Sequence, residues 1–381
     1  MAKLRFFKCS SFDPNYLKLF YAAHPEVRGL DFASAYARLV ADSFGWADFW
    51  KVNLEATGKF ECTDVVVNAA ALQQQWAQEH GVTWSAAHWP LEILLAQIKE
   101  FQPDILFTHD FSVVTSDFRR LVRRLVPSIQ LIIGWDGVAH CNLESFGGCD
   151  LMLAPVQHIA DFYSQRGVKS VLFKLGFEAR ILQRVELHHR TVNCSFVGSV
   201  FLGAHEKRFR TIADIARHVP IDLHLAISRG RFLRSRAGLL SRGDLSGLWR
   251  IARSWSDYRL LCAQSKPSLF GLEMYRKLAQ SQIGLNIHID VARDRSGNMR
   301  LFEVTGMGAC LLTDRKTNLG DFFEDGKEIV VFDDAQDAID KIRWLMANPA
   351  DREKIAIAGQ ARTLRDHSLA SSIEHLATTF C

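Results

Sequence analysis

The sequence predicts an α/β fold with two Rossmann-like, doubly wound domains that face one another across a cleft. Short β-rich runs alternate with helical stretches along most of the chain, which is typical of a parallel sheet covered by helices on both faces. This alternation starts twice, at residue 4 and again at residue 191. The chain has 381 residues, which is long for one hydrophobic core, so two domains are expected.

The first half of the chain supplies the first sheet. It opens on the apolar run LRFFKC, and Pro103 later ends a helix because proline cannot continue the helical hydrogen bonds. The expected strands cover residues 4–9, 64–69, 103–110, 129–136, 150–156 and 170–176. The expected helices cover residues 71–80, 91–101, 116–126 and 157–167. These elements form a first domain of residues 1–185.

The second half repeats the alternation after a charged, weakly periodic segment, residues 179–190, which is interpreted as a linker. The expected strands cover residues 191–199, 221–228, 283–288, 309–314 and 328–333. The expected helices cover residues 206–219, 297–306, 335–348 and 350–367. These elements form a second domain of residues 186–367.

The composition is that of a soluble globular protein, with 48% hydrophobic and 23% charged residues. A net charge of +4 is mild and does not indicate a nucleic-acid partner. The eight cysteines form no C-x-x-C pair and several lie in apolar runs, so buried, reduced thiols in a cytosol are expected. The first residues have too short an apolar run for a signal peptide, and no run is long enough to span a membrane. A cytoplasmic protein is therefore expected.

Residues 229–254 interrupt the alternation and contain seven arginines. Three interpretations stay open for this segment: a solvated helical face, a surface that docks on anionic lipid while the protein reaches a lipid-linked substrate, or a surface for an acidic partner. Aromatic residues are too sparse there for stacking on nucleic-acid bases. Peripheral contact with the inner face of a membrane would thus involve this segment.

The stretch SGNMRLFEVTGMGACLLTD, residues 296–314, combines a helix start with a carboxylate. Gly297 allows close backbone approach to a ligand and Asn298 can cap the helix, whose unpaired N–H groups favour an anion such as phosphate. Glu303 lies about one and a half turns further on and could accept hydrogen bonds from the hydroxyls of a ribose. The alternative is a structural pair between Glu303 and Arg300 at i−3. The pair Gly306 and Gly308 is expected only to end the helix.

Two segments resemble the CgeB-like group of bacterial glycosyltransferases. The donor half of this group is similar to the segment LFGLEMYRKLAQSQIGLNIHIDVARDRSGNMRLFEVTGMGACLLTD and to the sequence that follows that segment. The partner domain of the group looks like the N-terminal segment FYAAHPEVRGLDFASAYARLVADSFGWADFW. The resemblance covers nearly the whole chain. It implies the GT-B fold, with a nucleotide-sugar donor on the second domain, an acceptor on the first, and a last helix, residues 368–381, that crosses back to the first domain.

The resemblance also implies which residues bind the donor. Related retaining transferases carry a Glu-x7-Glu motif, and its second glutamate, which contacts ribose, matches Glu303. Arg295 replaces the first glutamate of the motif. The sequence therefore leaves open whether the transferred sugar keeps or inverts its stereochemistry. Many CgeB-like proteins carry Arg-x-x-Glu instead, which Arg300 matches. His288 ends a strand at the edge where ligands collect, and is either a phosphate or sugar contact or a structural histidine.

By the same resemblance Gly198 and Ser199 would form a glycine turn beside the diphosphate, with Arg208 or Lys207 as the neutralising base. His109 would lie beside the reacting sugar, and Asp110 would be the general base if the reaction inverts; the alternative for Asp110 is a helix cap. The expected contacts with the acceptor are Asp13, Asp136 and His140.

The expected function is therefore a nucleotide-sugar-dependent glycosyltransferase with a glycan, lipid-linked or protein acceptor. No cofactor or metal ion is expected, because helix dipoles and basic side chains would stabilise the leaving diphosphate and no acidic D-x-D signature follows a strand. Two alternatives stay open: a nucleotide-sugar epimerase or hydrolase of the same fold, and a non-catalytic nucleotide-sugar-binding protein, which Arg295 would favour.

Overall fold

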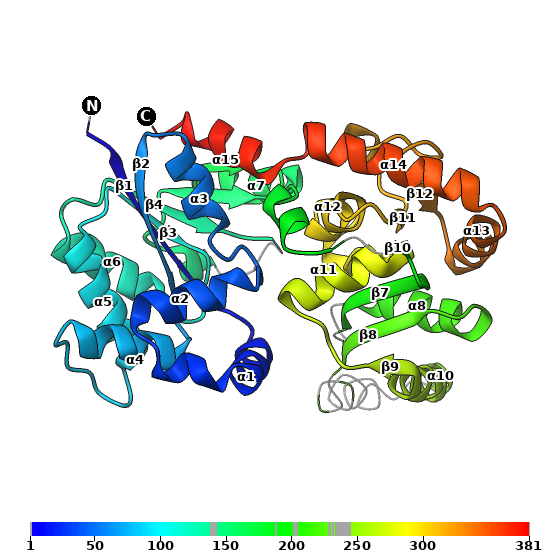
Figure 1. Cartoon of the computed structure of the whole chain (residues 1–381), viewed down its shortest axis with the longest axis horizontal. Coiled ribbons are helices and arrows are strands. Elements are labelled where there is room, and N and C mark those ends of the chain that lie inside the picture. Colours follow the sequence, from blue (N-terminus) through cyan, green and yellow to red (C-terminus); the bar gives the residue numbers. More distant parts are fainter. Residues whose placement is uncertain are drawn as a thin grey trace. The chain divides into compact units, whose positions relative to one another are not determined.

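The chain forms two compact units in the computed structural model, Met1–Lys174 together with Leu369–Cys381, and Leu175–Ser368 (Figure 1). The structure describes residues 2–137, 143–186, 189–200, 205–227, 230, 232 and 245–380, with the backbone alone for 245–252 and 291. The first unit therefore ends at Lys174, whereas the sequence analysis divides the domains at residue 185. Residues after Leu175 pack within the second unit: the Phe177 N–H donates to the carbonyl of His367 at 2.9 Å, and Ile181 is buried.

Unit 1 contains a six-stranded, fully parallel sheet in the order β2-β1-β3-β4-β5-β6. The strands are β1 (Leu4–Ser10), β2 (Phe60–Val66), β3 (Ile105–Thr108), β4 (Leu131–Trp135), β5 (Leu151–Ala154) and β6 (Ser170–Leu172). The helices are α1 (Pro14–Ala23), α2 (Phe32–Ala41), α3 (Phe49–Ala56), α4 (Ala70–Glu79), α5 (Trp89–Phe101), α6 (Ser116–Leu125), α7 (Gln157–Ser164) and α15 (Leu369–Ala377).

Helices cover both faces of this sheet. On one face Phe7 of β1 packs with Leu94 and Ile98 of α5 and Phe118 of α6. On the other face the Phe6 ring stacks on Trp50 of α3, with ring centroids 6.0 Å apart. Helices α1 to α3, which the sequence analysis does not separate, fill the connection from β1 to β2, and Asp13 and Asp31 cap two of them through hydrogen bonds to Asn15 and Ser34.

Unit 2 contains a second six-stranded parallel sheet, in the order β12-β11-β10-β7-β8-β9. Its strands are β7 (Val192–Val200), β8 (Asp222–Ile227), β9 (Ser265–Lys266), β10 (Ser281–Asn286), β11 (Cys310–Asp314) and β12 (Val330–Phe332). Its helices are α8 (Glu206–His218), α10 (Leu245–Gln264), α11 (Gly271–Gln280), α12 (Met299–Gly306), α13 (Ala335–Ala347) and α14 (Pro349–Asp366). The short 3-10 helices are η1 (Pro25–Gly29), η2 (Leu143–Phe146), η3 (Ala179–Gln183), η4 (Asp290–Ala292) and η5 (Leu319–Asp321). The α/β class with two doubly wound sheets is thus confirmed.

Helix α12 approaches its neighbours closely because two glycines leave room for it. A Cβ on Gly284 of β10 would lie 2.4 Å from the Val304 side chain of α12. A Cβ on Gly306 would lie 2.4 Å from the Phe177 ring. Gly308 follows with φ +71°. Gly306 and Gly308 therefore mark the end of α12, as expected.

The described cysteines are all free thiols, and Cys9, Cys62, Cys194 and Cys310 are buried, as the sequence analysis expects. None of the described helices combines the length and the apolar composition needed to cross a membrane.

Candidate functional site

The strand order of unit 2 defines where a ligand would bind. After β7 the chain moves outward to β8, whereas β10 lies on the other side of β7, so the order reverses between β7 and β10. In open parallel sheets, ligands bind outside the carboxyl ends of the strands at such a point. The residues at these ends include Ser199 on β7, His288 just after β10, and Asn298 at the start of α12.

Arg208 bridges the carboxyl ends of β7 and β10. Its side chain is 8% exposed, with Nε donating to the carbonyl of Ile287 at 2.8 Å and Nη1 to the carbonyl of Ser199 at 3.0 Å. Burial lowers the pKa of this guanidinium to about 10, and the Asp314 carboxylate opposes that shift. Arg208 therefore stays charged at neutral pH, at the carboxyl edge of the unit 2 sheet.

His288 is fixed by Asp314, the last residue of β11. The Nδ1 atom of His288 lies 2.7 Å from Oδ1 of Asp314, and the same oxygen accepts the His288 backbone N–H at 2.8 Å. Nζ of Lys316 lies 3.2 Å from Oδ2 of Asp314. Burial raises the pKa of Asp314, but the hydrogen bonds from His288 and the charge of Lys316 outweigh that effect, so the pKa falls to about 2. Asp314 is therefore ionised at neutral pH.

Asn298 occupies the N-cap position of α12, but its side chain does not cap the helix, contrary to the sequence-based expectation. Its amide instead donates to Oδ1 of Asn286 at 2.8 Å, and Asn286 donates to the Thr313 hydroxyl at 3.0 Å. The physical reason is that the bond from Nδ2 to Asn286 of β10 orients the Asn298 side chain so that Oδ1 does not bond to an N–H of the helix start. As a result Oδ1 of Asn298 is buried without a hydrogen-bond partner, as is Nε2 of His288.

Glu303 is 7% exposed and has two partners. Its Oε2 lies 2.8 Å from Nη1 of Arg300, and its Oε1 accepts from the Tyr275 hydroxyl at 3.3 Å. The i−3 pair with Arg300 that the sequence analysis gives as the alternative is therefore present. Since a carboxylate offers about four acceptor positions, Glu303 keeps capacity for a further hydroxyl donor.

Gly198 and Ser199 lie inside β7 and do not form the turn that the sequence analysis expects. The strand continues to Val200 because Gly198 and Ser199 pair in register with Leu225 and Ala226 of β8. The residues that follow, 201–204, lie outside the described residues. Arg295, which replaces the first glutamate of the motif, is exposed.

The strand order of unit 1 also reverses, between β1 and β3. Asp13 follows β1 and is exposed, with its carboxylate accepting from the Asn15 N–H at 2.7 Å as a helix cap. His109 and Asp110 follow β3, and the His109 N–H donates to the carbonyl of Cys9 at 2.9 Å. Asp13, His109 and Asp110 thus follow the carboxyl ends of neighbouring strands at one edge of the sheet.

Asp110 accepts hydrogen bonds from the backbone and the hydroxyl of Ser112 at 2.6 and 2.7 Å. It therefore holds a turn rather than a helix N-terminus, and its Oδ2 is buried without a hydrogen-bond partner. The half-buried His109 ring lies against Trp46, with ring centroids 4.7 Å apart. Burial and the nearby Lys8 ammonium lower the pKa of His109 to about 4, so its imidazole is neutral at pH 7.

Trp46 lies on a turn with unusual backbone angles. Ser43 and Ala47 have φ values of +57° and +31°, which side-chain-bearing residues rarely adopt. The buried Nζ of Lys8 on β1 donates to the carbonyl of Ala47 at 3.0 Å and lies 3.3 Å from Oδ2 of Asp64. This turn brings an aromatic wall to His109 that sequence reasoning did not find.

Asp136 follows β4 and is buried, and its carboxylate accepts from the Tyr163 hydroxyl. It is therefore an internal partner of α7 in unit 1. His140, named with it, lies outside the described residues, as do Arg229, Arg231, Arg234, Arg236 and Arg242 of the arginine-rich segment.

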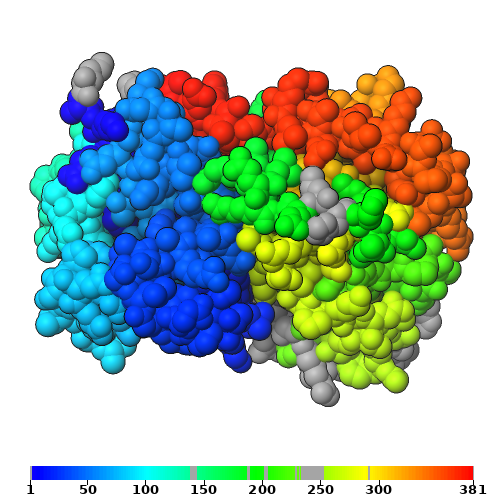
Figure 2. All heavy atoms as spheres, viewed as in Figure 1, coloured from blue at the N-terminus to red at the C-terminus, as the bar shows by residue number. Residues whose placement is uncertain are grey.

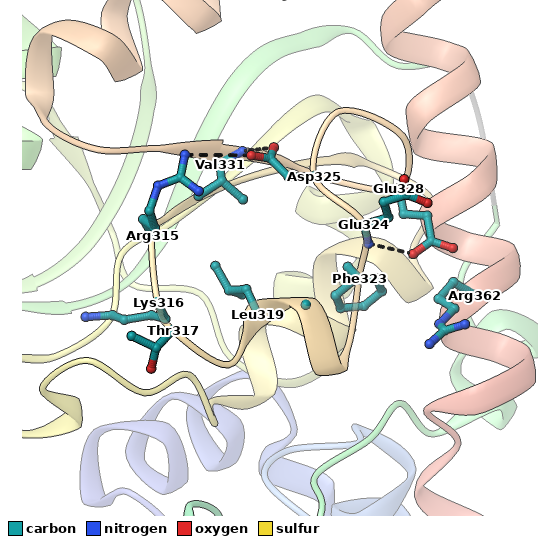
Figure 3. Close-up of a pocket in the computed structure, with 11 residues that line it drawn as sticks. Arg315, Lys316, Thr317, Leu319, Phe323, Glu324, Asp325, Glu328, Val331 and Arg362 are labelled. Atoms are coloured by element: carbon teal, nitrogen blue, oxygen red, sulfur yellow. Dashed lines mark hydrogen bonds and ion pairs between the residues drawn. The ribbon is translucent and has the colours of Figure 1, made fainter.

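A cavity of about 570 Å³ lies beyond the carboxyl end of β11 (Figure 3). Its lining residues are Arg315, Lys316, Thr317, Leu319, Gly320, Phe323, Glu324, Asp325, Glu328, Val331 and Arg362. Arg315 of this lining pairs with Asp333 and Asp325. The Lys316 side chain points away from the cavity (Figure 3). A second cavity, of about 390 Å³, includes Arg190, Gln282 and Arg352. Neither lining includes Arg208, His288, Asn298 or Glu303.

Sequence reasoning missed Asp314, Tyr275 and Asn286. Asp314 and Asn286 had a usable signal, since each is a polar residue at the end of a buried strand next to a candidate. Tyr275 had none, because its contact with Glu303 depends on how α11 packs on α12. Within the part of the chain that the structure describes, no three His, Cys, Asp or Glu side chains gather as a metal site.

Comparison with known proteins adds a partial match to a family model and a fold. Residues 228–378 match the family model described as glycosyl transferase-like, a range that includes Glu303, His288 and Asp314. No curated protein sequence shows significant similarity to the chain.

Solved structures resemble the whole chain. HepE from Anabaena, in complex with UDP and glucose, has a TM-score of 0.57 at 10% identity over 99% of both chains. A glycosyltransferase from Rickettsia africae has a TM-score of 0.59 at 10% identity over 100% of this chain and 98% of its own. Sucrose-phosphate synthase from Thermosynechococcus elongatus has a TM-score of 0.52 at 11% identity over 99% and 98%. This is the GT-B fold. At these identities the likeness establishes the architecture.

Proposed function

We propose that the chain is a metal-independent glycosyltransferase that moves a sugar, a hexose in our proposal, from a nucleotide-sugar donor to a glycan, lipid-linked or protein acceptor. One observation carries the proposal: the reversal point of the unit 2 sheet holds a buried Arg208 and two buried polar atoms that lack partners, Nε2 of His288 and Oδ1 of Asn298. Most of this cluster lies in the segment that matches the glycosyl transferase-like family.

The chemistry of the cluster suits a nucleoside diphosphate. Arg208 and the start of α12 provide positive charge and dipole for the phosphates, and these would stabilise the diphosphate as it leaves. Oδ1 of Asn298 needs a hydroxyl or amide donor, and Glu303 can accept hydroxyl hydrogens from a ribose. That HepE was solved with UDP and with UDP-glucose supports a uridine nucleotide as the donor.

Unit 1 would bind the acceptor at its own reversal point. A neutral His109 would lie beside the reacting sugar, and Asp110 would take the hydroxyl proton if the reaction inverts. Asp13 would contact the acceptor. Gly198, Ser199 and Gly297 would line the donor site with their backbone. We also place the chain in the bacterial CgeB-like group, in the cytoplasm, with residues 229–254 as its contact with a membrane surface.

Thermal unfolding with a panel of nucleoside diphosphates and nucleotide sugars tests the donor site. A ligand present at 100 times its Kd stabilises the folded protein by about 2.7 kcal/mol. We expect one nucleotide to raise the Tm of wild type, and Glu303→Gln to lose most of that rise because the amide no longer accepts at both oxygens. Absence of any shift in wild type contradicts the donor site.

Asp257→Asn is the matched control. Asp257 is also a buried carboxylate of unit 2 that pairs with an arginine, but its pair with Arg217 joins α10 to α8, away from Glu303 on α12. We expect Asp257→Asn to lower the Tm and yet keep the full nucleotide-induced rise. An equal loss in both variants would mean that Glu303 acts through stability alone.

Turnover separates the transferase from its alternatives. The stabilising nucleotide sugar is incubated with and without glycan acceptors, and the products are identified by NMR. A transferase releases nucleoside diphosphate mainly when acceptor is present. Rearrangement or hydrolysis of the sugar without acceptor would identify an epimerase or hydrolase, and tight binding without turnover would identify a binding protein.

A further inference from the structure

The His288–Asp314 pair leaves one nitrogen of the imidazole uncommitted. An ionised carboxylate only accepts hydrogen bonds, so the proton facing Oδ1 of Asp314 is on Nδ1 of His288. The second hydrogen bond, from the His288 backbone to the same oxygen, fixes the orientation of the pair. His288 is 3% exposed, and its Nε2 has no hydrogen-bond partner within the described residues.

Without a proton, Nε2 carries a lone pair, which repels the oxygens of a phosphate. With a proton, Nε2 becomes a charge-assisted donor, and Asp314 on the opposite side of the ring stabilises the imidazolium. Binding of the proposed diphosphate ligand therefore favours the protonated form of His288.

Charged groups from several elements surround the pair. Lys316 contacts Asp314, and Arg208 interacts with Asp314, Arg300 and Asp290. The titratable and charged groups that interact with Asp314 or with Arg208 are His288, Lys316, Arg300, Asp290 and, at the start of α8, His205. The three cations oppose a further positive charge on the ring, and a bound diphosphate would reverse that balance.

We propose that His288 binds a phosphate of the donor as an imidazolium, that a proton from solvent adds to Nε2 when the diphosphate binds, and that Asp314 is the positioning residue that makes this uptake favourable. The inference rests on the proposed function and deepens it, because it assigns the diphosphate to one atom and couples binding to pH. The balance is simple: Nε2 gains a proton and donates it in a hydrogen bond to a phosphate oxygen, and no covalent bond breaks.

The test is the Kd of the full chain for UDP between pH 7 and pH 8.5, a range in which the uracil ring of UDP stays neutral. The terminal phosphate of UDP ionises near pH 6, so it contributes little to the profile in this range. Wherever the complex holds one proton that the free protein lacks, the Kd rises about tenfold per pH unit, and the rise ends at the pH where the complex also loses that proton. We expect wild type to show that rise and His288→Gln to bind roughly 10-fold to 100-fold more weakly at pH 7 with a flat profile.

Two further variants separate positioning from structure. In Asp314→Asn the amide oxygen can still accept from Nδ1, but the negative charge is lost, so the rise in Kd should begin at lower pH. Asp222→Asn is the control, because Oδ1 of Asp222 lies 3.6 Å from Nε2 of His224 at the amino end of β8. We expect that variant to keep the wild-type profile.

A readout on wild type alone guards against misfolded variants. In ¹⁵N-histidine-labelled protein, Nε2 of His288 should shift to the protonated position when UDP is added at pH 8. A flat wild-type profile, or a profile that His288→Gln retains, overturns the proposal while leaving the donor site intact. If UDP and the rest of the panel fail to bind wild type, the proposed function and this inference both fall.

Discussion

His109 is a titratable residue with a measurable consequence for folding. Burial and Lys8 hold its pKa at about 4, below the value near 6.5 of a free histidine. Between those two values the unfolded chain binds a proton that the folded chain does not, so stability falls as the pH drops from about 6.5 to about 4.

We expect His109→Gln to show a smaller loss of stability than wild type between pH 7 and pH 4.5. The difference should be about 1–3 kcal/mol, because the half-buried ring is partly screened by solvent. Urea unfolding at both pH values measures it. Parallel losses in the two proteins would show that His109 is not held neutral by the fold.

At this scale the sequence predicted where the candidate residues lie in the fold better than it predicted their contacts. His288, Arg208 and Asn298 were found because strand ends and helix starts can be recognised from residue patterns. Their partners were not, since the contact of His288 with Asp314 joins two strands that are adjacent only in the folded sheet. The same limit explains the incorrect turn at Gly198, where pairing with β8 extends the strand.

At the scale of elements, α12 carries the helix start of the proposed donor site, and its position depends on Gly306. Alanine is favoured over glycine in a helix by about 1 kcal/mol. A methyl group at residue 306, however, would lie 2.4 Å from the Phe177 ring, and overpacking of this kind costs about 1–3 kcal/mol or more. The steric cost should outweigh the gain in propensity.

We therefore expect Gly306→Ala to lower the free energy of unfolding by about 1–2 kcal/mol, measured by urea denaturation. Gly320→Ala is the control, since a Cβ there meets nothing within 4 Å and the change should stay within about 0.5 kcal/mol. If Gly306→Ala is as stable as wild type, α12 can move away from Phe177, and its position is not fixed by this contact.

The elements with the strongest patterns were the most predictable ones. The helices α8, α13 and α14 and the strands β10 and β11 match their expected ranges within two residues. Helices α1 to α3 were missed as separate elements because turns and the strained segment around Ala47 divide a run rich in aromatic residues.

At the scale of the whole molecule, the chain ends in the unit where it begins. Helix α15 buries Leu369, Ile373 and Leu376 in unit 1, and the Phe380 ring lies 6.5 Å from that of Phe6 on β1. In Figure 2 the red residues of the C-terminus lie against the blue residues of this unit. Unit 1 therefore depends on residues that follow all of unit 2 in the sequence.

We expect Ile373→Ala to destabilise unit 1 by about 2–5 kcal/mol and to leave unit 2 unaffected. Hydrogen exchange reports this directly, through loss of amide protection in β1 and β2 but not in β10 and β11. Glu374→Ala, on the exposed face of the same helix, should leave both units protected. Equal loss of protection in both units would mean that they unfold as one.

The central claim is that a nucleoside diphosphate binds at the carboxyl edge of the unit 2 sheet. A crystal structure of the protein with UDP tests it most directly. We expect a phosphate oxygen within about 3 Å of Nε2 of His288, with the phosphates beside Arg208 and the ribose beside Glu303. A nucleotide bound instead in the cavity between Arg315 and Arg362, with His288 Nε2 still unpaired, would contradict the account.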